Sequence, residues 1–177
     1  WVKLTPANSS LLDGAAAAYA AGAASISLCN TFPSLPLMDP ETMKFEVEVD
    51  GLVSSGGLGG LAILHQALQR VNDISRAFPD KSISGIGGIK GFREAFNFIV
   101  HGAGNLQVCP AAMEEKGSGG VGVKLIQELK DDLLEYMQHK GHASIEDFRG
   151  VARDRVVEHS KIRRKSEDYN GGYAKSA

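Results

Sequence analysis

Short apolar segments typical of β-strands alternate with longer segments of helical periodicity along most of this chain. Such alternation is typical of βαβ units, in which crossover helices cover a parallel sheet. The pattern therefore predicts an α/β domain built on parallel strands. The predicted strands are 1–5, 25–29, 82–86 and 106–109, and the predicted helices are 9–21, 60–78, 91–100, 121–139 and 145–157.

The number of these units limits the architecture. A complete (β/α)₈ barrel needs about 250 residues, whereas this chain has 177. Four strand–helix units therefore predict half of a barrel, with a four-stranded open sheet as the competing architecture. The chain begins at Trp1, inside a predicted strand, and we expect a processed or incomplete N-terminus there.

Two segments interrupt the alternation. Residues 31–57 contain three prolines and one strand-like alternation, at Phe45, Val47 and Val49, and a loop of this length usually forms a lid or an interface. Beyond the last predicted helix the chain is basic at 161–165 and rich in Gly, Ser and Ala at its end. This composition favours a solvated tail, with an anchoring arm for a partner as the alternative.

Composition excludes several classes of function. The formal net charge of -2 provides no general basic field for nucleic acid, and the longest apolar run, 15–24, is about half of a membrane span. Two cysteines, Cys29 and Cys109, cannot build a disulfide framework, and their spacing does not suggest a metal site. We expect both to be small buried thiols in a reducing, cytoplasmic setting.

Polar side chains occur on the first strand and after the second. Alternation directs Lys3 away from the face that its apolar neighbours bury, so it either contacts an anionic cofactor or lies on an exposed edge strand. Asn30 and Thr31 follow the second strand, at the edge where parallel α/β folds bind ligands. Asn30 offers a donor and an acceptor to an amide-like ring, or it is simply a turn residue.

Three glycine clusters lie at junctions between elements, at 56–60, 85–88 and 118–120. Glycine before a helix lets backbone N–H groups approach a phosphate, although each cluster alone is also typical of an ordinary loop. Barrel phosphate sites commonly use the loops after the last two strands. Here those loops are Gly87-Gly88 and Cys109-Pro110-Ala111, which predicts a phosphate site between them.

Several of these motifs follow one another in a characteristic order along residues 1–150. They are Val2-Lys3-Leu4-Thr5-Pro6, Gly22-Ala23 leading to Asn30-Thr31, the segment 56–63, Gly85-Ile86-Gly87-Gly88-Ile89, Gly102-Ala103 through Leu106-Gln107-Val108-Cys109, and 143–148. Together they resemble the C-terminal half of the flavin barrel of the dihydropyrimidine dehydrogenase family, with the bacterial catalytic-subunit type the more similar. Dihydroorotate dehydrogenases share this scaffold.

The resemblance implies a TIM barrel that carries FMN at its carboxyl-end mouth, of which the four units would be strands five to eight. Lys3 corresponds to the lysine that contacts the flavin ring, and Asn30 and Thr31 correspond to residues that hydrogen-bond the pyrimidine. The chain departs from the family pattern at Gly59 and Pro110, where a serine and a serine or threonine are usual. The resemblance assigns the cofactor site to Lys3, Gly57, Gly59, Gly60, Gly87, Gly88, Cys109 and Pro110.

The implied activity is reduction of the CH–CH bond of uracil or thymine, with hydride passing between pyrimidine and flavin. A dihydroorotate dehydrogenase and a non-catalytic half-barrel module for assembly or phosphate binding are the alternatives. The family's proton-transfer cysteine belongs to the first half of the barrel, and neither Cys29 nor Cys109 matches it. No residue of this chain is therefore assigned a catalytic or metal-binding role.

The resemblance also implies partners. NAD(P)H and iron–sulfur clusters are expected on other segments or subunits, and the remainder of the barrel or an electron-transfer subunit is expected to complete the site. We expect an oligomer that binds neither nucleic acid nor membrane. The domain organisation expected is a half barrel at 1–150, followed at 151–177 by a helical extension and a flexible basic tail.

Overall fold

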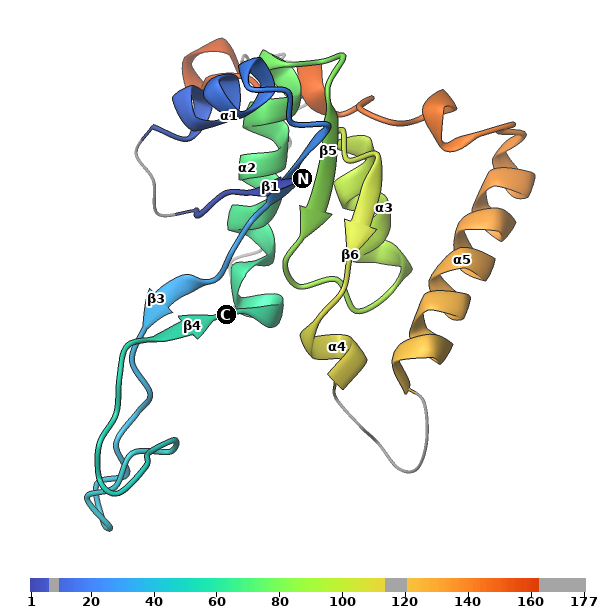
Figure 1. The fold of residues 1–177 in the computed structure, drawn as a ribbon. Helices are drawn as coiled ribbons and strands as arrows, with labels where there is room; N and C mark the ends of the chain where they lie inside the picture. The colour runs from blue at the N-terminus through green and yellow to red at the C-terminus, as the bar shows by residue number, and fades with distance from the viewer. Residues whose placement is uncertain (7–9, 114–120, 163–177) are drawn as a thin grey trace, which may run out of the picture.

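The computed structural model describes residues 1–6, 10–113 and 121–162, and its centre is one four-stranded parallel sheet (Figure 1). The strand order is β1-β2-β5-β6, so each strand of this sheet lies beside the next one that follows it through a helix. This order confirms the predicted parallel α/β architecture, and the sheet remains open, as expected of part of a barrel. The strands are β1 (Val2–Lys3), β2 (Ser25–Leu28), β5 (Ser82–Ile86) and β6 (Asn105–Gln107).

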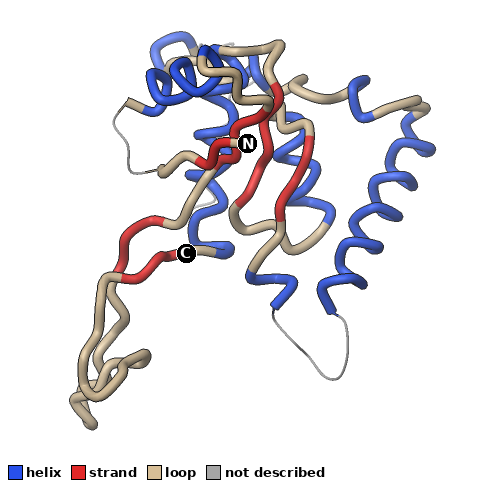
Figure 2. The backbone as a smooth tube through the Cα atoms, in the orientation of Figure 1, coloured by secondary structure: helices blue, strands red, loops and turns tan. Residues whose placement is uncertain are grey.

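Helices pack against the sheet on the side that faces away from the viewer and along the β6 edge (Figure 2). A 3₁₀ turn, η1 (Gly60–Ile63), leads into the second of them. No helix in the described ranges is both long enough and apolar enough to cross a membrane. The helices are α1 (Leu11–Ala20), α2 (Leu64–Ala77), α3 (Phe92–Val100), the short α4 (Pro110–Met113) and α5 (Val121–Lys140).

Alternation along the strands separates an apolar face from a polar one. Ile26, Leu28 and Ile83 are buried in the core that also contains Val71 and Phe98 of the helices. Burying each such side chain stabilises the fold by about 1.5–3 kcal/mol relative to exposure. Neighbouring residues of the same strands point to the opposite face, which no helix among the described residues covers.

The segment 31–57 forms a projecting arm rather than part of the sheet (Figure 1). Its base is an antiparallel pair, β3 (Phe32–Ser34) with β4 (Gly56–Leu58). The strand-like alternation at Phe45, Val47 and Val49 forms no strand, and beyond its base the arm contains only the isolated bridges Met38–Phe45 and Val49–Leu52. Val49 is 74% exposed, so no second layer supports a longer strand.

The helix predicted at 145–157 is also wrong. This segment contains only two 3₁₀ turns, η2 (Ile145–Asp147) and η3 (Arg153–Arg155). Backbone N–H groups of Gly150 and Ala152 instead donate to the carbonyls of Ile99 and Val100 at 3.0 and 2.9 Å, which ties the segment to the end of α3. The glycine cluster 118–120 and the tail after 162 lie outside the described residues.

Candidate functional site

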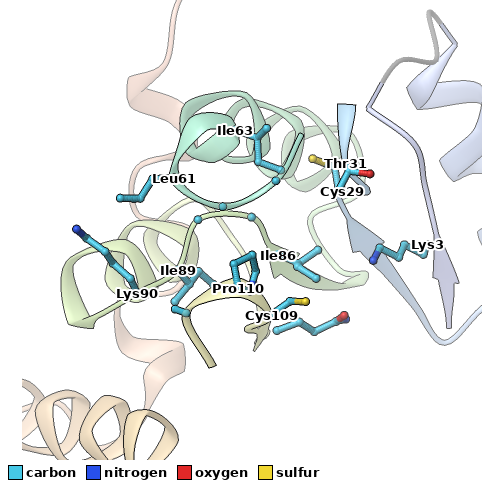
Figure 3. A pocket seen from close by; sticks show the side chains of 16 residues that line it. Lys3, Cys29, Thr31, Leu61, Ile63, Ile86, Ile89, Lys90, Cys109 and Pro110 are labelled. Atoms are coloured by element: carbon cyan, nitrogen blue, oxygen red, sulfur yellow. The ribbon is translucent and has the colours of Figure 1, made fainter. Parts of the chain in front are cut away.

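A cavity of about 260 Å³ opens at the carboxyl edge of the sheet (Figure 3). The segments that follow β2, β5 and β6 converge there with η1 and with the side chain of Lys3 on β1. Ten residues were predicted to bind the cofactor or the pyrimidine, and the structure brings eight of them together. The eight that line the cavity are Lys3, Thr31, Gly59, Gly60, Gly87, Gly88, Cys109 and Pro110.

The glycines allow two loops to meet backbone against backbone. Gly88 has a φ of +77°, and a Cβ there would lie 2.9 Å from the carbonyl oxygen of Gly60 and 2.9 Å from Leu64 Cβ. A Cβ on Gly60, whose φ is +65°, would point toward the Pro110 ring at 3.9 Å. The two loops predicted to form the phosphate site, at Gly87-Gly88 and at Cys109-Pro110, therefore both lie beside Gly60, and a side chain at Gly88 would push its loop away from Gly60.

Backbone donors remain available where Gly60, Gly87 and Gly88 meet Cys109 and Pro110, which we call the glycine junction. Among the described residues, the N–H groups of Gly87, Gly88 and Cys109 donate to no other backbone carbonyl. Pro110 has no N–H to contribute. The junction thus offers free N–H groups and a backbone surface without side chains, which is the chemistry that a phosphate group requires.

Lys3 extends from β1 toward the same cavity (Figure 3). Within the described part of the chain its ammonium makes no ion pair. It is exposed on an edge strand and also lines the cavity, so the edge-strand interpretation is confirmed and contact with an anionic cofactor stays a prediction. An unpaired cation at this place is suited to an anionic or electron-rich ligand.

Asn30 and Gly57 do not line the cavity. The Oδ1 of Asn30 accepts a hydrogen bond from the Thr31 N–H at 2.9 Å, so the side chain supports the turn after β2. Gly57 lies in β4, and a Cβ there would overlap the side chain of Thr31. Both residues thus contact Thr31, which itself reaches the cavity.

The two cysteines differ in environment. Cys29 is buried as expected, and removal of its thiolate from water raises the pKa to about 11, against the opposing positive charges of Arg70 and Lys3. Cys109 is exposed, so the prediction that it is buried is wrong. It is the second residue after β6 and immediately precedes α4. In the described ranges, no cluster of three or more His, Cys, Asp or Glu side chains could hold a metal ion.

Gln107 lines the cavity and is not among the site residues predicted from the sequence. Its Nε2 donates hydrogen bonds to the hydroxyl oxygens of Ser27 and of Ser84, the latter at 2.8 Å. Ser27 and Ser84 are almost completely buried on the face opposite the helices. Alternation along β2, β5 and β6 places these three side chains on one face, but only the register of the strands brings them into contact.

Residues 1–137 match the family described as dihydroorotate dehydrogenase. Among similar proteins, the chloroplastic NADP⁺ dihydropyrimidine dehydrogenase of Arabidopsis thaliana is 30% identical over 173 residues, which is 95% of this chain and 39% of that protein. The catalytic subunit of dihydroorotate dehydrogenase B (NAD⁺) of Petrotoga mobilis is 33% identical over 150 residues, covering 85% of this chain and 46% of that subunit.

A third relative is the PreA subunit of the NAD-dependent dihydropyrimidine dehydrogenase of Escherichia coli. It is 30% identical over 158 residues, which is 88% of this chain and 37% of that subunit. The chain therefore spans less than half the length of each of these three relatives. They include both dihydropyrimidine and dihydroorotate dehydrogenases, and the similarity does not separate the two activities.

Proposed function

The chain belongs to the dihydroorotate dehydrogenase family, and from this premise we propose that it forms the phosphate-binding half of a flavin-dependent pyrimidine oxidoreductase. In this proposal FMN binds at the cavity, and the whole protein reduces the CH–CH bond of uracil or thymine to a dihydropyrimidine. The names of the Arabidopsis and Escherichia coli relatives, each aligned over most of this chain, support this substrate class.

The observation that carries the proposal is the convergence of a cation and a backbone anion site in one cavity. Lys3 lies on β1, whereas Gly88 follows β5 and Cys109 follows β6, yet all three line the same space. FMN combines an electron-rich ring with a phosphate, so a ligand of this kind needs both features. Neither a phosphate alone nor a simple apolar molecule requires this combination.

The residues present fit the phosphate end of FMN. The glycine junction forms a cradle that a Cβ on Gly88 would fill, and the free N–H groups of Gly87, Gly88 and Cys109 match phosphate oxygens. The cavity of about 260 Å³ is smaller than the roughly 300–1,000 Å³ typical of ligand sites, so it would enclose only part of the cofactor. The remainder would lie over the open face of the sheet.

The protein's own groups would bind and orient the reactants. When bound, the flavin supplies the hydride chemistry, which the protein side chains cannot perform. Lys3 would place a positive charge beside the ring and favour its anionic reduced form, and Thr31 would hydrogen-bond the pyrimidine through its hydroxyl. Asn30 would act with Thr31, since its Oδ1 already fixes the Thr31 backbone. The companion proton would come from a group outside this chain.

Flavin titration tests the proposal. We expect the purified chain to quench FMN fluorescence on binding and to bind FMN about tenfold more tightly than riboflavin, which has no phosphate. Lys3→Met should weaken binding of both flavins, because it removes the charge beside the ring. A chain that binds neither flavin, or that does not distinguish them, would contradict a flavin phosphate site at the glycine junction.

A dihydroorotate dehydrogenase is the second candidate, favoured by the match to the Petrotoga mobilis subunit over 85% of this chain. Uracil and orotate differ by one carboxylate, so the two substrates can be compared directly. Each is added to the FMN-loaded chain while the visible flavin bands are recorded. A larger perturbation by uracil supports the dihydropyrimidine activity, and a larger perturbation by orotate supports the alternative.

A non-catalytic module is the third candidate, and the open edge of β6 is the observation that favours it. Beside this edge, β6 and α5 enclose an apolar groove of about 600 Å³. A partner strand could close the groove without any flavin chemistry. A chain that binds inorganic phosphate but no FMN would favour this candidate over both enzymes.

A further inference from the structure

The side chain of Gln107 links three strands of the sheet. It extends from β6, and its Nε2 donates to the Ser84 hydroxyl of β5 at 2.8 Å and to the Ser27 hydroxyl of β2. Ser27 and Ser84 are partners in the parallel register, so their hydroxyls lie about one strand spacing, roughly 4.8 Å, apart. The two N–H bonds of one primary amide diverge, and one can reach each hydroxyl.

The hydrogen bonds made by Ser27 extend this link to β1. The register pairs Ser27 with Lys3, and the Ser27 carbonyl accepts a hydrogen bond from the N–H of Leu4 at 3.1 Å. Ser27 therefore bonds β6 through its hydroxyl and β1 through its backbone. It connects the residue that follows Lys3 to the strand that leads to Cys109.

This connection matters because β1 is otherwise weakly held. It has two residues, lies at the edge of the sheet and pairs only with β2 among the described strands. The glycine junction instead follows β5 and β6, which lie two and three strands away from β1 in the sheet. The affinity for a ligand that contacts both Lys3 and the glycine junction therefore depends on the distance between them.

We propose that Gln107 is a positioning residue that fixes the Lys3 side of the cavity relative to the glycine junction through Ser27 and Ser84. The inference rests on the proposed function, since it concerns a ligand with both a ring and a phosphate. In the described part of the chain the Oε1 of Gln107 has no hydrogen-bond partner. The carboxamide thus keeps one acceptor for the ligand or its water.

The proposal predicts different effects on two probes. Gln107→Leu removes both donors while keeping a side chain of similar size. We expect it to raise the Kd for FMN about tenfold and to change the Kd for inorganic phosphate less than twofold, because phosphate contacts the junction alone. The matched control is Gln127→Leu on α5, whose amide donates to Asp131 at 2.7 Å on an exposed helix face and which should change neither Kd.

The conservative variant Gln107→Glu distinguishes a positioning role from a general loss of structure. Gln107→Glu can accept hydrogen bonds from both serine hydroxyls, so it should keep FMN affinity within about threefold of wild type. Its added negative charge beside the ring should lower the flavin reduction potential. An unchanged FMN affinity in Gln107→Leu would overturn the proposal, as would an equal loss of FMN and phosphate binding.

A measurement without flavin separates this inference from the proposed function. In the ligand-free chain, Gln107→Leu should move the backbone amide NMR resonances of Leu4 on one side and of Gly88 on the other. A wild-type chain that does not bind FMN would contradict the proposed function, while this measurement would still test the link. Changes confined to β5 and β6 would overturn the proposal.

Discussion

At the scale of single residues, burial decides which thiol of this chain can react. Cys29 and Cys109 lie near the same cavity, and they are the only cysteines of the chain. Burial raises the pKa of Cys29 to about 11, the principal cause being loss of contact with water. Thiolate is the reactive form, so proximity to the cavity does not make Cys29 a nucleophile at neutral pH.

We expect iodoacetamide at pH 8 to alkylate Cys109 and to leave Cys29 largely unmodified. Three pH units below its pKa, only about one Cys29 in a thousand is a thiolate. The rate at Cys29 should increase as the pH rises toward 11, because a raised pKa moves the ionisation to higher pH. Mass spectrometry of wild type and Cys109→Ser measures both rates. Alkylation of Cys29 as fast as that of Cys109 at pH 8 would show that Cys29 is accessible and ionised.

A substitution at Pro110 is expected to increase the affinity for FMN. Proline lacks the N–H that another residue would present at the glycine junction, and the Pro110 ring lies next to Gly60. Pro110→Ser supplies an N–H and a hydroxyl, so we expect FMN to bind about fivefold more tightly while riboflavin is unaffected. Pro40→Ser, in the exposed arm, is the matched control. Tighter binding of riboflavin as well would assign the gain to something other than the phosphate.

At the scale of elements, the sequence predicts those helices and strands whose formation depends on the spacing of nearby apolar residues and on the residues at their ends. The segments Ser82–Ile86 and Phe92–Val100 form the strand and helix expected from their apolar spacing and flanking glycines. The helix expected at 145–157 is absent because its backbone bonds to Ile99 and Val100, about 50 residues earlier in the chain. Long-range contacts of this kind leave no periodic signal in a sequence.

The residues of the candidate site differ in the same way, because some have a local sequence signal and others depend on long-range contacts. Gly87 and Gly88 could be predicted, because consecutive glycines at a strand end indicate a backbone that other residues rarely adopt, and both have positive φ. Gln107 could not be predicted, because its partner Ser27 is 80 residues away in the sequence. Only the register of the sheet makes them neighbours.

The glycine junction provides an element-scale stability test. Gly88→Ala combines a positive φ with overlap against the Gly60 carbonyl, so we expect it to lower the free energy of unfolding by about 3 kcal/mol. Gly22→Ala is the matched control, since Gly22 has a φ of +89° but no atom within 4 Å of the added Cβ. It should cost about 1 kcal/mol. Urea denaturation measures both variants, and equal losses would mean that the loops do not pack as described.

At the scale of the whole molecule, the sheet has two unpaired edges and one face without helices among the described residues. Along β6, the Oδ1 of Asn105 is buried and has no hydrogen-bond partner within the described ranges. Leu106 and Val108 line the groove that β6 forms with α5. A strand placed there would satisfy the free backbone groups and fill the groove, so the isolated chain should associate through this edge.

The direction of the N–H groups along β6 allows this association to be blocked selectively. The N–H of Leu4 donates to the Ser27 carbonyl at 3.1 Å, so the Ser27 backbone faces β1, and in the parallel register Ser84 then faces β2 while Gly85 faces β6. Asn105 and Gln107 therefore donate to β5, and the N–H of Leu106 points toward the free edge. Leu106→Pro removes an edge donor without removing a hydrogen bond to β5. We expect wild type to self-associate in sedimentation velocity runs and Leu106→Pro to remain mostly monomeric and folded.

Proline one residue earlier in β6 provides the control for that experiment. The N–H of Asn105 faces β5, so Asn105→Pro should break the internal ladder and unfold the chain, which circular dichroism would detect. Association that persists in a folded Leu106→Pro variant would place the contact elsewhere, with the projecting arm next to be tested. Leu52 there is 76% exposed, and Leu52→Lys would then be expected to dissociate the complex. The two variants thus assign any self-association to the sheet edge or to the arm.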